Sequence, residues 1–496
     1  MDPKAPPGAS SASAAREVEE FSGELGDAEA APANPTATLA AQAGLGELAH
    51  APPRSESSGE IWRLAWPVML SQLLASLVGL VDVAMVGRLG PAAQAAVGYA
   101  AQLFFLSQSA LFAIGFACVA LMARAIGAGD PQQARRVLAA SLGLTLLVAS
   151  LLAAAIAGAP ETLLGWLSAD PEVVRLCVPY LRLLMASSVL LGVALTFESA
   201  LRADRDTRTP MRITLVVTGI KVALNALLIF GWLGAPRLEL VGAGLATLAA
   251  QAVALALFVA AVLRTPAHEA TALRGRDFRG SARHLPELTR IAFPGVLERV
   301  VMNVAMLFYF AFLGGYGTVA AATYTIGIRI LSVSWIPGIG YSQAVATLVG
   351  QALGAERPAG AVDATWRSAR MALATAVGMG LLAALAREPL ARMFTVDPET
   401  VTTLGPFLLC LAVAQPAMQL HFTLAGAFRG AGDTWTPLVA ALIGNWIFRV
   451  PLAFAAARIL ALPLEWIWAV LILDHLARAT FLLLRLRRWG QKVRAR

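Results

Sequence analysis

The sequence predicts an all-α, polytopic membrane protein, with twelve transmembrane helices arranged as two homologous six-helix lobes. Of the 496 residues, 58% are hydrophobic and only 14% are charged, whereas about a quarter of the residues in soluble domains are charged. The mean hydropathy is +0.67. The apolar residues gather in segments that reach the ~20 helical residues needed to cross a bilayer. An internal repeat is the third observation behind this fold class.

The repeat consists of landmarks that return after a constant offset of 227 residues. The pentapeptide RLAWP, which ends at Pro67, returns as RIAFP, which ends at Pro294. The stretch LRADRDTRTP at 201–210 returns as FRGAGDTWTP at 428–437. The offset stays constant from the first pentapeptide to the end of the second motif, which indicates a duplicated unit without net insertion. Secondary transporters are commonly built from such repeats.

The predicted organisation runs from a polar tail through two lobes. Residues 1–58 are rich in Ala, Pro, Ser, Gly and Glu and have no apolar periodicity, so we expect a disordered cytoplasmic tail. An N-lobe at 59–264 is followed by a cytoplasmic linker at 265–286. A C-lobe at 287–488 and a basic cytoplasmic tail at 489–496 complete the chain.

The spans follow from apolar length and from the Gly, Pro and charged residues that separate the apolar segments. In the first half they are 61–87, 92–123, 134–158, 174–202, 211–233 and 240–264. In the second half they are 287–313, 318–350, 364–386, 400–429, 436–458 and 462–486.

The basic residues predict the orientation in the membrane. They concentrate in the loops after the second, fourth, sixth and eighth spans and in the C-terminal tail, whereas the opposite loops are poorer in Arg and richer in acids. We therefore predict that both termini are cytoplasmic, in the inner membrane of a bacterium. The same distribution explains the net charge of +8 without a nucleic-acid partner. The start of the chain does not resemble a cleaved signal peptide.

One acid lies within the first span and is the leading functional candidate. Asp82 is five residues from the outer end of that span, about 8 Å deep at the helical rise. A carboxylate at such a position is costly unless it faces protein or water, so it is usually retained for a role. Asn225 lies at a similar depth in the fifth span, and Lys221 is one turn deeper on the same face.

Lys221 is one of three lysines in the chain, and the other two lie near the ends. A pair between Lys221 and Asp82 permits two interpretations. In the first, protonation of Asp82 removes the partner of the ammonium and changes the packing of span one. In the second, the pair is a static structural ion pair.

Charged residues within the second half are expected to neutralise one another. The four candidates are Glu298, Arg299, Arg449 and Asp474, and three of them, Glu298, Arg449 and Asp474, fall near the middle of their spans. Buried charges of opposite sign must pair, so we predict a structural network. Glu198, four residues before Arg202, is expected to pair with that arginine at the inner end of span four.

A substrate cleft is expected between the two lobes. Methionine and aromatic side chains suit a promiscuous apolar site, although each residue has ordinary helix packing as its alternative. The candidates are Met69, Gln72, Met85, Phe104, Phe105, Met302, Phe308, Tyr309 and Gln419.

These residues resemble the multidrug and toxic compound extrusion (MATE) transporters. The resemblance is carried by Pro67 and Asp82 in the first span, by GRLG at 87–90, and by the repeated motifs at 201–210 and 428–437. The single acid of the first span is similar to the DinF-like branch. The family implies a V-shaped pair of lobes, related by a pseudo-twofold axis along the membrane normal, and cation-coupled export by alternating access.

The resemblance also implies roles for particular residues. Asp82 corresponds to a cation or proton site. A fifth-span asparagine followed by an acid four residues later often completes a sodium site in this family, but Asn225 is followed by Ile229. Coupling to protons is therefore expected over coupling to Na⁺. Some members place a cation site on a seventh-span acid, which is the alternative role for Glu298.

The expected function is a proton-coupled antiporter that exports amphiphilic or cationic compounds as a monomer in the lipid bilayer. No cofactor other than the coupling ion and no metal site is expected, and the three cysteines have no disulfide or metal spacing. A flippase for lipids or lipid-linked oligosaccharides is an alternative within the same superfamily. A membrane-embedded enzyme is disfavoured because GxxxxGK[ST] and HExxH motifs are missing from the sequence.

Overall fold

The computed structural model describes residues 57–167, 170–234, 236–394 and 397–494. The described residues belong to one compact unit, Glu56–Arg496, so nearly all of the predicted tail at 1–58 lies outside them. Helices make up the described part of the chain, in which there is no β-strand. Eleven helices in that part are long and apolar enough to cross a membrane. The all-α membrane fold predicted from the sequence is therefore confirmed.

The N-lobe contains six long helices and two short ones. Their bounds are α3 (Ser58–Gly87), α4 (Pro91–Gly127), α5 (Pro131–Gly158), α6 (Pro160–Trp166), α7 (Pro171–Ala203), α8 (Arg208–Phe230), the 3₁₀ turn η2 (Trp232–Gly234) and α9 (Glu239–Arg264). Local sequence explains several helix starts. Asp130 accepts a hydrogen bond from the Gln133 amide at 2.8 Å and precedes Pro131 at the first helical position.

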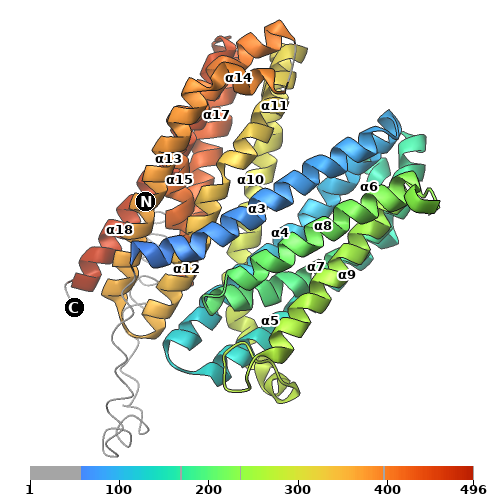
Figure 1. The fold of residues 1–496 in the computed structure, drawn as a ribbon. Helices are drawn as coiled ribbons and strands as arrows, with labels where there is room; N and C mark the ends of the chain where they lie inside the picture. Colours follow the sequence, from blue (N-terminus) through green and yellow to red (C-terminus); the bar gives the residue numbers. More distant parts are fainter. Residues whose placement is uncertain (1–56, 168–169, 235, 395–396, 495–496) are drawn as a thin grey trace, which may run out of the picture. The chain divides into compact units, whose positions relative to one another are not determined.

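The C-lobe begins after two 3₁₀ turns, η3 (Gly275–Phe278) and η4 (Ser281–His284). Its elements are α10 (Leu285–Leu313), η5 (Gly314–Tyr316), α11 (Thr318–Ser334), α12 (Ile336–Gly354), α13 (Pro358–Leu385), α14 (Arg387–Arg392), α15 (Pro398–Gly430), α16 (Trp435–Leu442), the π-helix η6 (Ile443–Arg449), α17 (Val450–Phe454), the π-helix η7 (Ala455–Ile459) and α18 (Leu464–Arg494). Figure 1 shows α4–α9 gathered in one group of helices and α11–α18 in a second group, with α3 running from beside α12 toward the first group.

The predicted span at 318–350 is two helices rather than one. The break between α11 and α12 falls at Trp335, two residues before Pro337. Proline has no amide hydrogen to donate to the preceding turn and restricts the residue before it. The Gln419 side chain donates a hydrogen bond to the Ser334 carbonyl at 2.6 Å, so a neighbouring helix satisfies the carbonyl at the end of α11.

The predicted span at 436–458 is continuous but changes helical type twice. Its α-helical parts alternate with the π-helical segments η6 and η7, on either side of α17. Pro451 lies in α17 and removes one helical donor. Wider π turns are often found at functional sites because they turn side chains away from the α-helical register. Here η6 carries Asn445 and Arg449, which are both buried.

The two lobes meet through α3 and α4 on one side and α10 and α12 on the other. At the C-terminal ends of α4 and α12 the contact is reciprocal. A Cβ atom on Gly127 would lie 2.0 Å from the Gln351 carbonyl oxygen, and one on Gly354 would lie 2.0 Å from the Arg124 carbonyl oxygen. Both pairs are related by the offset of 227 residues, so the duplication places one glycine contact on each side of the lobe interface.

A polar clamp lies beside this contact. Arg205 follows α7 with φ +63°, and its Nε donates to Gln351 Oε1 of α12 at 2.6 Å. Arg205 also pairs with Glu60 of α3. The Gln351 amide donates back to the Ala203 carbonyl at 2.6 Å. The lobes are thus joined at this end by close backbone packing and by charge-assisted hydrogen bonds.

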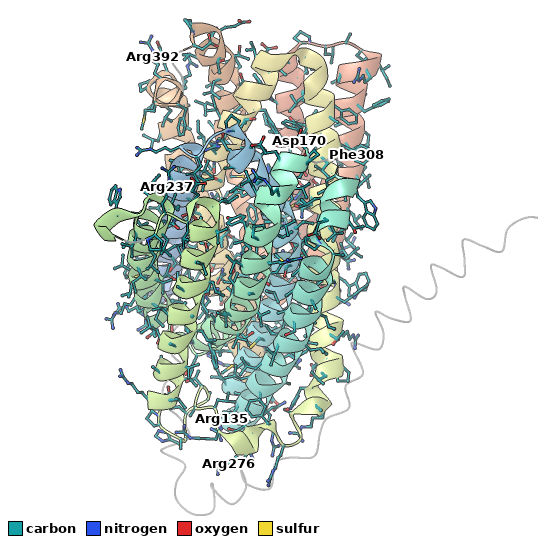
Figure 2. The ribbon with its side chains drawn as sticks, turned by 90° about the vertical axis from the view of Figure 1, so that its right-hand side faces the viewer. Arg135, Asp170, Arg237, Arg276, Phe308 and Arg392 are labelled. Atoms are coloured by element: carbon teal, nitrogen blue, oxygen red, sulfur yellow. The ribbon has the colours of Figure 1, made fainter. Side chains whose placement is uncertain are left out.

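The loops with opposite charge character lie at opposite ends of the helices. Figure 2 shows Arg135 and Arg276, from loops predicted to be cytoplasmic, at one end. Asp170, Arg237 and Arg392, from loops predicted to lie outside, are near the other. This separation is the pattern that the predicted topology requires.

Candidate transport cavity and its charged groups

A cavity of about 750 Å³ lies between the two lobes. Its walls come from α3, α4, α7, α8 and α9 of the N-lobe and from α10, α12, α15, α16, η6 and α18 of the C-lobe. Small-molecule sites in proteins commonly have volumes of roughly 300–1,000 Å³. The apolar part of the lining includes Phe104, Phe105, Phe112 and Phe116 from one helix, α4. The cavity is therefore large enough for an aromatic small molecule.

Asp82 lies on the N-lobe wall and contacts both residues that were predicted to lie near it. Lys221 Nζ donates to Asp82 Oδ2 at 2.5 Å, and Asn225 Nδ2 donates to Asp82 Oδ1 at 2.5 Å. The contact forms because α3 packs along α8, so one residue of α3 meets two residues one turn apart on α8. Asp82 and Lys221 line the cavity, with side chains 29% and 19% exposed.

One turn of α8 beyond Asn225, the surroundings of the Asp82 site become apolar. Ile229 is fully buried within a hydrophobic cluster that includes Val86 and Cys177. Asn225 is 1% exposed, which fixes its amide beside the carboxylate. The described residues contain no group of three or more His, Cys, Asp or Glu side chains arranged to hold a metal ion. The positive partner of Asp82 is the lysine ammonium.

Of the four charges predicted to form a network in the C-lobe, only Arg449 and Asp474 form a direct ion pair with each other within the described residues. Glu298 pairs with Arg429 of α15 at 2.6 Å. Asp474 pairs instead with Arg449 and with Arg478. Glu298 lies on α10 and reaches the arginine near the C-terminal end of α15 through its side chain, whereas Asp474 lies on α18, which packs against η6.

Asp474 is the centre of the second of these two ion-paired groups. It is fully buried and accepts from Arg478 Nε at 2.6 Å. Arg478 also donates to Asn445 Oδ1 at 2.8 Å. Asn445 enters the network through the π-helix η6, a feature that the sequence pattern did not predict. Arg478 is i+4 from Asp474 on the same helix, and this spacing was the available signal for the pair.

Arg299 belongs to neither group. No hydrogen bond or ion pair connects it to another residue in the described part of the chain. Its guanidinium lies over the Phe112 ring of α4, 5.8 Å from the ring centroid, and it lines the cavity. Arg299 is close enough to Glu298 for an electrostatic interaction but forms no ion pair with it, so its part in a neutralising network stays a prediction.

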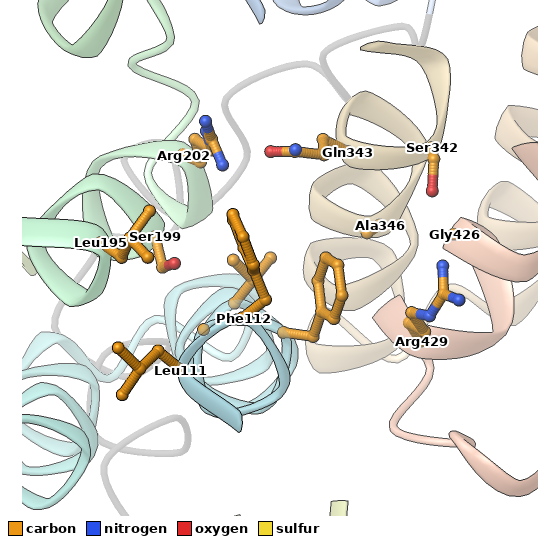
Figure 3. Close-up of a pocket in the computed structure, with 13 residues that line it drawn as sticks. Leu111, Phe112, Leu195, Ser199, Arg202, Ser342, Gln343, Ala346, Gly426 and Arg429 are labelled. Atoms are coloured by element: carbon orange, nitrogen blue, oxygen red, sulfur yellow. The ribbon is translucent and has the colours of Figure 1, made fainter. Parts of the chain in front are cut away.

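Two arginines that line the cavity occupy equivalent positions in the two repeats. Arg202 of α7 pairs with Glu198, as its i,i+4 spacing predicted. Its repeat counterpart, Arg429, lies over the Phe116 ring at 5.1 Å. Figure 3 shows the two guanidiniums on opposite sides of a small pocket, with Gln343 and Phe112 between them, and these four residues also line the main cavity. The offset of 227 residues was the sequence signal for Arg429.

The predicted cleft residues divide into two sets. The lining includes Gln72, Phe104, Phe105 and Met302. Two of the remaining candidates are corrected, because they are buried within the C-lobe. The Tyr309 side chain is fully buried and donates to the Ile467 carbonyl at 2.8 Å, and Gln419 is fully buried against the α11 terminus.

Three further candidates lie outside the lining. Met69 packs against Gly340 of α12, and Met85 packs in the N-lobe cluster around Cys177. Phe308 is 46% exposed and contacts the Trp446 ring edge-on at 5.9 Å, at the periphery of the helices in Figure 2. Methionine and aromatic residues are frequent in packed helices as well as in cavities, so composition alone did not separate these positions.

Two duplicated helical lobes around a charged, aromatic cavity define a membrane transporter. The MatE family model matches residues 67–227 and 294–455, and the chain belongs to this family of multidrug efflux transporters. The two matches begin at the two prolines of the repeated pentapeptide, Pro67 and Pro294. The predicted family is confirmed.

Bacterial relatives match over nearly the full helical region. A probable multidrug resistance protein NorM of Thermotoga maritima is 28% identical over 428 residues, covering 86% of this chain and 91% of the relative. A probable NorM of Bradyrhizobium diazoefficiens is 30% identical over 452 residues, covering 88% and 94%. A relative from Shewanella oneidensis, named FAD transporter, is 27% identical over 412 residues, covering 80% and 91%.

Solved structures share the fold. A MOP superfamily transporter from Pyrococcus furiosus has a TM-score of 0.82 at 23% identity, covering 88% of this chain and 96% of that one. A MATE family transporter described in an outward-facing conformation has a TM-score of 0.83 at 23% identity, covering 88% and 97%. Their fold has twelve helices in two lobes, which agrees with the predicted architecture.

Proposed function

We propose that the protein is a proton-coupled antiporter that exports amphiphilic compounds across a bacterial cytoplasmic membrane by alternating access of its two lobes. The observation that carries the proposal is the Asp82 carboxylate on the cavity wall, 2.5 Å from both Lys221 and Asn225. An ionisable pair within membrane-spanning helices is commonly retained for ion or proton movement. With its side chain 29% exposed, the carboxylate can exchange protons with water in the cavity.

Protonation of Asp82 would change the packing of α3 against α8. The neutral acid no longer attracts the Lys221 ammonium, which then needs water or substrate groups as partners. Substrate bound in the cavity is released as these groups rearrange, and deprotonation toward the other side restores the pair. This cycle uses Asp82 as the proton carrier, Lys221 as its counter-charge and Asn225 as its positioning partner.

Coupling to sodium is the alternative for the same residues. A sodium ion is normally surrounded by several oxygen ligands, as other hard cations are. Beside Asp82 the neighbouring positions are the Lys221 ammonium and, one turn beyond Asn225, the buried Ile229. An ammonium close to the carboxylate already supplies positive charge and opposes a second cation. These contacts favour the proton as the coupling ion.

A flippase for lipids or lipid-linked oligosaccharides is the second candidate. The specific observation in its favour is that arginines from both lobes line the cavity, among them Arg202, Arg299 and Arg429. Anionic headgroups pair with such groups. The named relatives include multidrug resistance proteins and an FAD transporter, and these names favour export of small amphiphiles.

The test is transport by the full chain in proteoliposomes with an imposed pH gradient, an imposed sodium gradient, or neither. We expect the pH gradient alone to drive substrate movement. Asp82→Asn should reduce gradient-driven transport at least about tenfold, because the amide cannot carry a proton. Transport by wild type that follows only the sodium gradient would contradict proton coupling.

Matched variants separate coupling from folding. Glu388→Gln removes an exposed carboxylate from the ion pair with Arg392, outside the cavity, and should transport like wild type. The double variant Asp82→Asn with Lys221→Met leaves no unpaired charge, so it should regain stability relative to Asp82→Asn alone without regaining coupling. Wild-type transport by either variant that lacks Asp82 would rule out this carboxylate as the proton carrier.

A further inference from the structure

We propose that the cavity takes substrates that carry an anionic group, a carboxylate or a phosphate, on an apolar aromatic body, and that Arg299 binds the anionic group. This inference rests on the proposed function as an exporter and specifies the substrate class of the same cavity. It narrows the expected amphiphilic or cationic compounds to amphiphiles that carry a negative charge.

The charges that line the cavity do not balance. Three carboxylates and six cationic side chains belong to the lining. Each lining carboxylate pairs with one lining cation. The three pairs are Asp82 with Lys221, Glu198 with Arg202, and Glu298 with Arg429. The remaining cations are Arg299, Arg449 and Arg478, and all three come from the C-lobe.

The cavity keeps two positive charges in excess even when Asp474, a carboxylate just outside the lining, is counted. Asp474 lies behind the wall, fully buried, and contacts both Arg449 and Arg478. One carboxylate shared by two guanidiniums leaves one positive charge. Arg299 adds the other, because no ion pair or hydrogen bond holds it within the described residues. The C-lobe side of the cavity is therefore electropositive.

Arg299 has its hydrogen-bond donors free for a ligand. Its only ring contact in the described chain is with Phe112, at 5.8 Å. Stacking on a ring uses the face of the guanidinium and leaves the N–H donors in its plane available. The flat fork of donors matches the two oxygens of a carboxylate or phosphate. When the anionic group of a ligand binds the guanidinium of Arg299, the apolar part of the ligand can contact the Phe112 ring.

The second excess charge lies further along the same wall. Arg299 and Met306 both face the cavity from α10, two turns or about 10 Å apart along the helix axis. Arg449 Nη1 lies 3.7 Å from Met306 Sδ. A molecule of drug size can thus place one anionic group at Arg299 and extend toward Arg449 over the methionine. The apolar lining between the two arginines suits a flat ring system.

A cationic substrate would find no free partner in the lining. Each lining carboxylate already accepts from a cation, so binding must either break an ion pair or place a positive charge near Arg299. In a cavity with low effective dielectric, charges of the same sign repel strongly. The low effective dielectric also strengthens the attraction between Arg299 and an anion. The charge distribution therefore favours anionic over cationic substrates.

The test compares two dyes with the same xanthene ring system, the anion fluorescein and the cation rhodamine 123. Binding to the purified full chain is measured by fluorescence anisotropy at mildly alkaline pH without any gradient. We expect fluorescein to bind at least about tenfold more tightly. Arg299→Gln should weaken fluorescein binding about ten- to hundredfold, the effect of losing one or two charge-assisted hydrogen bonds.

The variants report on charge rather than on folding. Arg299→Lys keeps the charge and should retain most of the affinity for fluorescein. Arg299→Gln should leave the affinity for rhodamine 123 unchanged or raise it, which a misfolded variant would not do. Arg392→Gln removes an exposed arginine on α14, outside the cavity, and should bind both dyes like wild type. Tighter binding of rhodamine 123 by wild type, binding of neither dye, or equal weakening of both by Arg299→Gln would overturn the proposal.

The same measurements keep this inference separate from proton-coupled export. Fluorescein binding with Arg299 dependence, but without transport driven by a pH gradient, would support the substrate class and contradict the coupling. Transport of rhodamine 123 alone, driven by that gradient, would overturn the substrate class and support the coupling.

The anionic group can belong to a soluble molecule or to a lipid headgroup, and a third arm distinguishes them. Vesicles with phosphatidylglycerol, or with phosphatidylcholine as the matched control, are tested for competition with fluorescein. Transfer of fluorescent phosphatidylglycerol between leaflets is followed by dithionite quenching. Competition and transfer specific to phosphatidylglycerol identify a lipid substrate, whereas fluorescein transport unaffected by phosphatidylglycerol identifies a soluble one; both support an anionic substrate.

Discussion

Individual charged residues in this protein owe their behaviour to the helix opposite them. Asp82 meets Lys221 across the contact between α3 and α8, and the Glu298 side chain on α10 reaches Arg429 on α15. Arg299, next to Glu298 in the sequence, lies over an aromatic ring and forms no ion pair or hydrogen bond within the described residues. Adjacent residues on one helix point in different directions, so their partners and their roles differ.

Asp204, at the end of α7, provides a pH-dependent prediction at this scale. Burial raises its pKa to about 6, with further contributions from the nearby Glu269 and Asp206 and an opposing one from Arg205. Because the unfolded chain ionises near 3.8, the native state binds more protons than the unfolded state between these values. Stability from this group is therefore lost as the pH rises from the unfolded pKa through about 6.

Asp204→Asn should stabilise the protein above about pH 7 by about 1–2 kcal/mol, and have little effect near pH 4. The neutral amide avoids the cost of a buried charge at high pH, whereas the carboxyl group is itself protonated at low pH. Thermal unfolding in detergent at the two pH values measures the difference. An equal gain at both would show that ionisation of Asp204 is not the cause.

The packing of the helices restricts residue size where two helix backbones approach closely. The contact of α4 with α12 depends on Gly127 and Gly354, because any side chain there would overlap the opposite backbone. Breaks in the helices have local causes as well, such as Pro337 at the start of α12. The π segments around Pro451 turn Asn445 and Arg449 into the network of Asp474.

Gly354→Ala tests the close approach of these two helices. The added Cβ would lie 2.0 Å from the Arg124 carbonyl oxygen, so the helices must separate. We expect a loss of about 1–3 kcal/mol in stability, which is typical of overpacking, measured by thermal unfolding in detergent. Gly378→Ala is the matched control, since its Cβ would have no neighbour within 4 Å in α13. Equal effects of both variants would argue against a packing role for Gly354.

The whole molecule is held closed at one end and contains its cavity between the lobes. Reciprocal glycine contacts and the Arg205 clamp lie at the closed end, where α4 and α12 terminate. The proposed alternating access would require this end to open during transport. The contacts there must therefore be strong enough to close the lobes and weak enough to release them.

Arg205→Ala should shift the lobes toward separation at this end, because it removes hydrogen bonds to both Glu60 and Gln351. Spin labels at Gln132 and Ala359, exposed and related by the repeat, report the distance by pulsed electron paramagnetic resonance in a background without native cysteines. We expect a larger population at long distances.

Arg208→Ala is the matched control for that measurement. Arg208 is an exposed arginine three residues from Arg205, and its loss should leave the distance distribution unchanged. If Arg205→Ala also leaves the distribution unchanged, the hydrogen bonds of Arg205 do not contribute to closure, and this end is held without them by contacts such as the close glycine packing and the Gln351–Ala203 hydrogen bond.

The predicted elements agree with the structure most closely where one physical signal dominates. Apolar length and proline placed the first span at 61–87, and α3 runs over Ser58–Gly87. The contact between Asp82 and Asn225 was predicted from their similar distances to the outer ends of their spans. Prediction was weaker for the cleft, because Tyr309 and Gln419 have side chains typical of a lining but are fully buried.

The sequence by itself determined the membrane class, the duplication and the carboxylate of the first span, because apolar length, a constant offset and a single acid within the first span are local or periodic signals. Only the tertiary structure decided which cation each carboxylate takes as its partner, and which cation is left without one. Pairing depends on the rotation and packing of helices that are distant in sequence. The excess charge at Arg299, from which the anionic substrate class is inferred, arises from that arrangement.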